Sequence, residues 1–264
     1  MNRIAHKDKQ LPSFKKPPLI EVACGISFKA LESLKIPHYG LFWNEIREEF
    51  PLCQHAPPLG DISTEIITNE FPLPRVWLIA KSKNILLQLQ KDRFVFNWRK
   101  ISSDEEYPRF DNVFIQFKQY LNKFINFLDS NEIGKFEPVR CELTYINHIV
   151  KGEGWESLED INNIMRDIML SSDKSFLPEP SGLSWNGSYP FQNDEGALTV
   201  KLTHAKRKSD LLDLLVLELA TKGFRIGDNL DENLSWYDLA HSWIVNGFAD
   251  ITQQEIQTKL WGRE

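Results

Sequence analysis

The sequence predicts an α+β fold built from two similar halves, and three observations lead to this prediction. Short strands with alternating apolar residues cluster between long helices, without the regular strand–helix–strand alternation of a parallel sheet. The order strand, helix, antiparallel meander and long helix occurs twice along the 264 residues. Each half also opens with a proline four residues before a glutamate, as Pro17 and Glu21 and again as Pro138 and Glu142.

The first half is expected to span residues 17–134, after a flexible basic arm at residues 1–16. Its first strand covers residues 20–28, where apolar positions alternate with small or polar ones, and a helix follows at residues 39–50. Three strands joined by short polar turns predict an antiparallel meander, at residues 75–80, 85–90 and 94–99. A long helix with a continuous apolar stripe closes this half at residues 110–128.

The second half is expected at residues 135–264 and repeats the same order. A strand at residues 139–145 precedes a helix at residues 158–168, and an irregular stretch follows at residues 177–195. Two longer strands joined by a basic turn come next, at residues 197–204 and 212–220. A second long helix begins near Ser235.

These elements predict curved antiparallel sheets, each holding a long helix on its inner face and packed together as one unit. The pattern leaves open whether the halves form one continuous sheet or two. The nearest known shapes with this element order are duplicated TATA-binding-protein-like and helix-grip-like arrangements, which is an analogy of order alone.

Composition points to a cytoplasmic globular protein. Hydrophobic residues make up 42% of the chain and charged residues 26%, as in ordinary globular domains. The longest apolar run, near residues 211–219, falls short of the roughly 20 residues that a membrane-spanning helix needs. The three cysteines, Cys24, Cys53 and Cys141, are widely spaced and odd in number, which favours reduced thiols over a disulfide framework.

Motifs for cofactors and metals are missing, so neither is expected. The chain has no glycine-rich nucleotide-binding signature. Cys53 and His55 offer two metal ligands, but nothing nearby in sequence supplies the others.

Glutamates on predicted strands are the candidates for catalysis. Glu21 and Glu142 hold corresponding places in the two halves, and Glu218 interrupts an apolar strand. Two carboxyl groups facing each other would form an acid/base pair, because proximity raises the pKa of one of them. The simpler interpretation is that each glutamate faces solvent or pairs with a cation such as Arg99 or Arg140.

Aromatic side chains in the irregular stretch are the candidates for binding a partner protein, because large rings in a surface loop either fold back or contact a partner. These residues are Trp185, Tyr189 and Phe191. Weaker candidates for nucleic-acid binding lie in the basic turn, at Lys206, Arg207 and Lys208. Phe94, Phe96 and Trp98 share one face of a predicted strand, where they either stack on bases or belong to the core. The net charge of −6 does not favour nucleic acid as the partner.

Three segments resemble a sporadically distributed, functionally uncharacterised bacterial protein family of similar length. They are the opening residues 16–22, the run Arg140-x-Glu142-x-x-Tyr145-Ile146-Asn147, and the tail from His241 through Phe248 to Thr252. The resemblance implies a single-unit bacterial protein and assigns no residue a role. Its patchy distribution implies mobile genes, such as those of phage defence or toxin control.

The function expected from the sequence is therefore protein interaction in the bacterial cytoplasm. Two alternatives stay open. One is a hydrolase-type enzyme with paired carboxylates in a groove between the halves, and the other is a nucleic-acid-binding protein.

Overall fold

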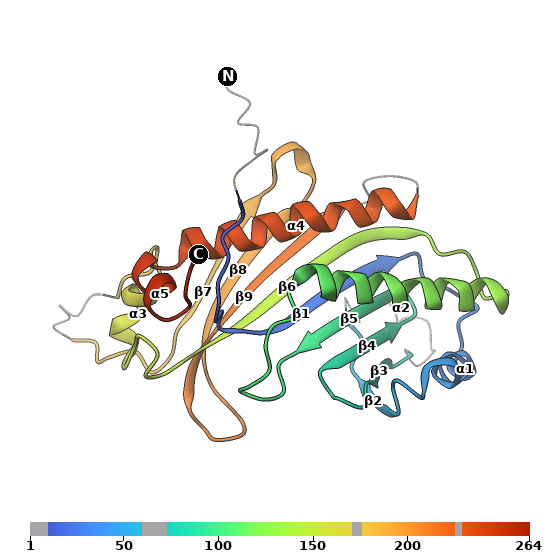
Figure 1. Ribbon diagram of the computed structural model, residues 1–264, viewed down its shortest axis with the longest axis horizontal. Helices are drawn as coiled ribbons and strands as arrows, with labels where there is room; N and C mark the ends of the chain where they lie inside the picture. The colour runs from blue at the N-terminus through green and yellow to red at the C-terminus, as the bar shows by residue number, and fades with distance from the viewer. Residues whose placement is uncertain (1–9, 60–72, 171–175, 225–228) are drawn as a thin grey trace.

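All nine strands of the described chain belong to one antiparallel sheet (Figure 1). The computed structural model describes residues 10–59, 73–170, 176–224 and 229–264. The strand order across the sheet is β2-β3-β4-β5-β1-β6-β9-β8-β7. The α+β class predicted from the sequence is confirmed, and the expected strands form a single sheet.

The centre of the sheet is the antiparallel pair of β1 (Leu19–Phe28) and β6 (Pro138–Val150). Strands on the β1 side come from the expected meander and one short edge strand: β2 (Leu52–Ala56), β3 (Arg75–Ile79), β4 (Ile85–Gln90) and β5 (Arg93–Arg99). Strands on the β6 side come from the later part of the chain: β7 (Ser184–Pro190), β8 (Ala197–Lys206) and β9 (Asp213–Phe224).

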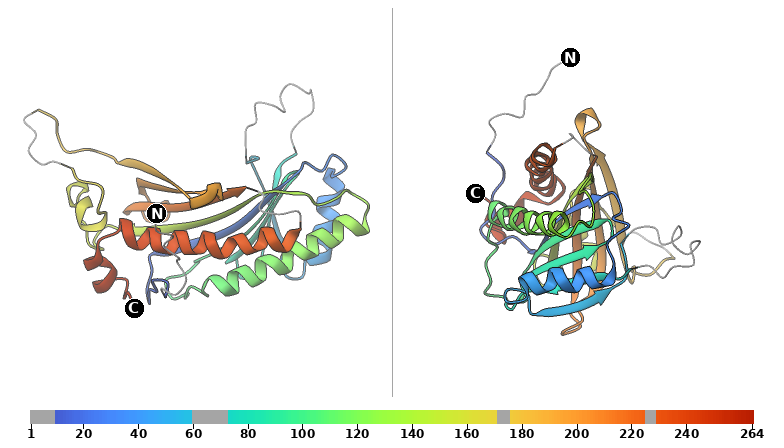
Figure 2. Two further views of the ribbon diagram at one scale, coloured as in Figure 1. Left: turned by 90° about the horizontal axis from the view of Figure 1, so that it is seen from above. Right: turned by 90° about the vertical axis from the view of Figure 1, so that its right-hand side faces the viewer.

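Two long helices, α2 (Phe110–Ser130) and α4 (Leu230–Ile251), lie on the same face of the twisted sheet (Figure 2). Helix α2 packs on β5 and β1, whereas α4 packs on β6, β9 and β8. The side chain of Asn229 caps α4 by accepting a hydrogen bond from the backbone of Glu232 at 2.8 Å. Shorter helices complete the layer: α1 (Ile36–Ile46), α3 (Ile161–Ile164) and α5 (Gln254–Lys259), with 3-10 turns η3 (Leu158–Asp160) and η4 (Gln192–Asp194).

Alternation along the strands gives the sheet two different surfaces. The helix face carries the apolar core, including Val22, Cys24 and Ile26 of β1, which are all fully buried. The opposite surface, called the back face below, carries polar and charged residues such as Glu21 of β1 and Asn97 of β5. This two-faced pattern is the period-two signal that the sequence shows in β1.

The structure differs from the sequence-based expectation in three segments. The expected helix at residues 158–168 reduces to one 3-10 turn and the four-residue α3. The stretch at residues 177–195, expected to be irregular, contains β7 at the edge of the sheet. In the expected flexible arm, residues 1–9 lie outside the described residues, while residues 13–16 are held against residues 261–264 by backbone hydrogen bonds.

Candidate functional site

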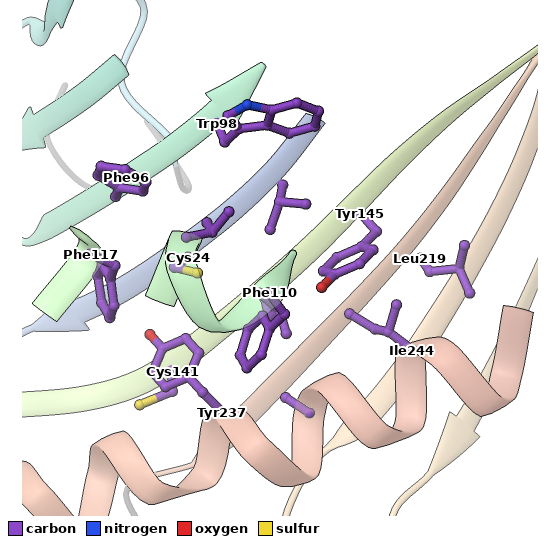
Figure 3. Close-up of a cluster of buried hydrophobic side chains, with 14 of the residues drawn as sticks. Cys24, Phe96, Trp98, Phe110, Phe117, Cys141, Tyr145, Leu219, Tyr237 and Ile244 are labelled. Carbon is purple, nitrogen blue, oxygen red and sulfur yellow. The ribbon is translucent and has the colours of Figure 1, made fainter. Parts of the chain in front are cut away.

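A cavity of about 240 Å³ lies on the helix face, where the start of α2 approaches α4 above β6 and β9. Its walls come from the segment at residues 11–14, the residues leading into β1, the start of α2, and one side of α4. Phe110, Tyr145, Leu219 and Ile244 approach one another from four different elements (Figure 3). The polar residues that line this largely apolar space are Ser13, Tyr107, Arg109, Asp111, Tyr145, Asn147 and His241.

One wall depends on the strap, residues 11–16, which crosses the cavity before β1. The backbone N–H groups of Lys15 and Lys16 donate to the carbonyls of Gly262 and Trp261 at 3.1 and 3.0 Å. Phe14 is buried, and its ring meets Phe248 of α4 edge-on at 5.3 Å. The strap is therefore anchored both by backbone pairing and by an aromatic contact.

Arg109 connects the strap to the start of α2. Its guanidinium donates a hydrogen bond to the carbonyl oxygen of Phe14 at 3.2 Å. Its backbone has φ 73° and ψ 153°, a region that non-glycine residues rarely adopt and that costs roughly 1–3 kcal/mol. Strain of this kind is concentrated at binding and catalytic sites, where the surrounding structure holds it in place.

Two tyrosines form a hydrogen-bonded pair at the floor of the cavity. The hydroxyl oxygens of Tyr107 and Tyr145 lie 2.9 Å apart. Burial raises the pKa of both hydroxyl groups, so both stay protonated at any physiological pH. Nearby, the buried Asn147 donates through its amide nitrogen to the carbonyl of Leu217 at 3.1 Å.

His241 supplies a neutral imidazole to the same space. Its ring stacks on Phe110 with centroids 4.1 Å apart. Burial lowers its pKa to about 4, and the nearby carboxylate of Asp111 opposes this shift only in part. No hydrogen bond to either ring nitrogen occurs within the described part of the chain. The neutral ring therefore has one donor and one acceptor to offer to a molecule in the cavity.

The candidate glutamates lie on the back face, away from this cavity. Although β1 and β6 are neighbours, Glu21 lies opposite Ile146 and Glu142 lies opposite Gly25. A four-residue offset along a strand is about 13 Å, so the expected Glu21–Glu142 pair does not form. Ile146 of β6 lies between Glu21 of β1 and Glu218 of β9, because it is opposite both of them in the register. The backbones of Glu21 and Glu218 are therefore two strand spacings apart, about 10 Å.

Glu142 and Glu21 each have a protein partner on the back face. Glu142 lies 3.4 Å from the guanidinium of Arg93, and Glu21 accepts a hydrogen bond from Asn97 at 2.6 Å. Burial raises the pKa of Glu21, Asn97 and Arg99 lower it, and Glu218 adds a smaller upward shift.

The aromatic candidates for partner binding are less exposed than expected. Phe191 is only 4% exposed and stacks on Trp243 of α4 at 4.3 Å. Trp185 and Tyr189 are half-buried on β7 and pack against the core. Phe191 is therefore a core residue, because its ring fills the space between the edge of the sheet and α4.

The basic turn joins β8 to β9, and acidic neighbours balance most of its charge. Arg207 forms an ion pair with Asp210, and Lys206 lies 3.6 Å from Asp213. Lys208 is exposed. Phe94, Phe96 and Trp98 belong to the core, so they are not available to stack on bases.

No protein-family model and no curated protein sequence matches the chain. None of the helices in the described ranges is long and apolar enough to cross a membrane. Among the residues that the structure describes, no group of three or more histidine, cysteine or acidic side chains is arranged to hold a metal ion.

Residues from the three sequence segments at residues 16–22, 140–147 and 241–252 meet at the cavity. Pro17, Tyr145, Asn147, His241 and Phe248 all line it, although they come from three distant segments. Sequence reasoning did not assign them a site. The available signal was His241, because it lies four residues after Tyr237 and seven before Phe248, on the apolar stripe of a predicted helix.

Proposed function

We propose that the protein binds a small, uncharged and mainly apolar molecule in the cavity between the strap, α2 and α4. The observation that carries this proposal is an apolar space with a few converging polar groups, closed on one side by the strap. The strap accepts a hydrogen bond from Arg109, whose own backbone is strained. Small-molecule sites have this composition, with apolar walls that provide affinity and a few polar groups that fix orientation.

The size of the cavity limits the ligand. A cavity of about 150 Å³ is large enough to admit benzene. The volume of about 240 Å³ is therefore suited to a single substituted ring or a short branched chain. A larger cofactor would require the strap to move.

The polar groups favour a ligand with one hydroxyl or amide group. His241 is neutral at physiological pH and offers a donor and an acceptor without a charge. Tyr107 and Tyr145 already satisfy each other, and Arg109 already donates to the strap. Arg109 and Asp111 both line the cavity with opposite charges, so a charged ligand would meet a like charge as well as a counter-charge, which favours an uncharged molecule.

Phenol is a suitable probe, because it combines one ring with one hydroxyl. We expect saturable binding followed through the imidazole resonances of His241, with benzoate as the charged comparison. Val245→Phe places a ring into the cavity and should weaken phenol binding by about tenfold or more, since it removes the volume that the ligand needs. Asn246→Phe adds the same ring at an exposed position on the same helix and should leave binding unchanged. Equal binding by both variants would refute the proposal, as would the absence of saturable binding.

Protein interaction, the function expected from the sequence, has separate support from exposed apolar side chains. Met169 is 81% exposed and Phe176 is 91% exposed, and Leu177, next to Phe176 in sequence, is also exposed. Large apolar groups in such positions are typical of contact surfaces. Replacing Met169 and Phe176 by serine should abolish capture of a stoichiometric partner in a tagged pull-down, and unchanged capture would remove this candidate. A place in phage defence or toxin control stays a prediction.

We also infer that the chain is an internal duplication. Support comes from the sheet order, in which β1 and β5 on one side correspond to β6 and β9 on the other, with α2 corresponding to α4. The cavity then lies at the junction of the two halves. Fitting β1 and β5 onto β6 and β9 should bring α2 onto α4, and a failure to do so would contradict the duplication.

A further inference from the structure

The back face of the sheet carries a second cluster of polar groups, remote from the cavity and formed by β3, β4 and β5. Arg75 and Trp77 project from β3, Gln88 from β4 and Arg93 from β5. The register places Trp77 opposite Gln88, and the guanidinium of Arg75 lies 5.5 Å from the centre of the Trp77 ring. Arg93 lies opposite Ser27 of β1, on the side of the cluster nearest β6.

Buried polar atoms without a protein partner are concentrated on this face. Six such side-chain atoms occur among the described residues, and five of them lie on the back face. Four of the five are donors, at Arg75 Nε, Trp77 Nε1, Arg93 Nε and Arg99 Nε, and the fifth is the acceptor Glu142 Oε1. Buried donors are normally paired, so an excess of unpaired donors in one place calls for acceptors from outside the described residues, such as ordered water or a bound group.

Arg75 has fewer partners for its charge than Arg93, the other arginine of this cluster. Its only side-chain hydrogen bond within the described residues goes to the amide oxygen of Gln88 at 3.0 Å, and no carboxylate lies within ion-pair distance of it there. Burial lowers the pKa of this guanidinium, and the like charge of Arg93 lowers it further. Two cations are therefore held close enough to repel each other.

The carboxylates of the described residues neutralise the pair only in part, through the contact of Glu142 with Arg93. Arg93 reaches Glu142 at 3.4 Å, which is a long contact, and one oxygen of Glu142 stays unpaired. Glu21 is reached from Arg75 only through a chain of amides, in which Gln88 donates to Asn97 at 2.7 Å and Asn97 donates to Glu21 at 2.6 Å. This chain fixes Gln88 and so fixes the orientation of Arg75.

We propose that Arg75, Trp77 and Arg93 form a binding site for an oxyanion, the phosphoryl or carboxylate group of a small ligand. Two guanidinium groups supply planar donors that match such a group, and the indole N–H of Trp77 is a further unpaired donor on the same face. The side chain of Arg93 keeps 15% of its surface exposed, whereas the unpaired donor atoms are buried, so an anion reaches them only after side chains around the cluster move. The site lies on the opposite side of the sheet from the cavity and is independent of the function proposed for it.

The indole N–H of Trp77 provides a direct readout in the full-length protein. Its signal in an indole ¹H–¹⁵N spectrum is assigned by its loss in Trp77→Phe. Titration with inorganic phosphate and with acetate at constant ionic strength, with chloride as the balancing salt, should give a saturable shift of this signal for at least one of the two anions. Tighter binding of phosphate identifies a phosphoryl ligand, and equal or tighter binding of acetate identifies a carboxylate.

Variants separate a specific site from general charge effects. Arg75→Gln should weaken anion binding by about tenfold to a hundredfold, because it removes a charge-assisted hydrogen bond. Arg47→Gln removes an exposed arginine of the segment after α1 and should change nothing. Arg75→Lys keeps the charge but loses the fork and should bind at an intermediate level, which tests the geometry even if Arg75→Gln fails to fold.

Three outcomes would overturn this inference: no saturable shift with either anion, equal binding by wild type and the Arg75 variants, or equal weakening by Arg47→Gln. Val245→Phe, which fills the cavity, should leave the anion titration unchanged. The failure of one proposal is therefore distinguishable from the failure of the other.

Discussion

His241 should make the protein less stable in acid by a predictable amount. The unfolded chain takes up a proton on this residue near pH 6.5, whereas the folded protein keeps the ring neutral down to a pKa of about 4. Protons therefore bind the unfolded state more readily between these values, and stability is lost as the pH falls from about 6.5 toward 4. Each unit of difference between the pKa values of the folded and unfolded states corresponds to about 1.4 kcal/mol of stability. Between pH 7 and pH 4.5 this difference amounts to a loss of roughly 2–3 kcal/mol.

The test compares wild type with His241→Gln by urea denaturation at pH 7, 5.5 and 4.5. The substitution should destabilise the protein at pH 7, because it removes the stacking contact with Phe110. It should also remove the acid sensitivity that His241 causes. The difference in the free energy of unfolding between wild type and variant should therefore narrow by about 2–3 kcal/mol as the pH falls to 4.5. All other titrating groups, including Asp111, are common to both proteins. A gap that stays constant over this range would refute the assignment of His241 as a buried neutral residue.

Three further substitutions test other parts of the structure. Glu21→Gln should raise the free energy of unfolding at pH 7 and have no effect below the usual carboxyl range: burial raises the pKa of this group, so its ionised form costs stability as the pH rises. Urea titrations at pH 4 and pH 7 measure this, and a loss of stability at pH 7 would contradict it. Tyr107→Phe leaves the hydroxyl of Tyr145 without a partner and should lower the free energy of unfolding by about 1–3 kcal/mol. Replacing both tyrosines by phenylalanine should recover much of this loss. Equal shifts of the melting temperature in the single and double variants would argue against the pair. Gly223→Ala adds a methyl group that would overlap the indole of Trp236, so a loss of at least about 1–3 kcal/mol is expected, and an unchanged melting temperature would show that this packing is wrong.

The fold was largely predictable because its core strands and its long helices have strong periodic patterns. The meander at β3, β4 and β5 and the two long helices appear in sequence as alternation and as apolar stripes. The prediction of a helix at residues 158–168 was wrong because its apolar positions, including Met165, are also compatible with a short turn followed by an extended segment. Met165 instead forms an isolated bridge with Thr252. Periodicity over so few residues does not separate these outcomes.

The candidate site was much harder to predict because its parts come together only in three dimensions. Arg109 and Tyr107 precede a helix in an unremarkable segment, and nothing in the sequence reveals the positive φ of Arg109. The glutamates were placed on strands correctly, but their mutual offset depends on the register of β1 against β6. Register is determined by packing on the helix face, which a pattern of single strands does not specify.

The pairing of residues 13–16 with residues 261–264 has a consequence for the order in which the protein assembles. Ser13 and Glu264 are 251 positions apart, so this contact closes one of the longest loops that the described chain allows. Contacts of such separation form late, after the entropy of the intervening chain has been lost through local and sheet contacts. During synthesis the strap stays unpaired until the segment around Trp261 has left the ribosome. The wall that the strap forms at the cavity therefore appears only after the segment around Trp261 has folded, and a nascent chain that has already formed its sheet still lacks this wall.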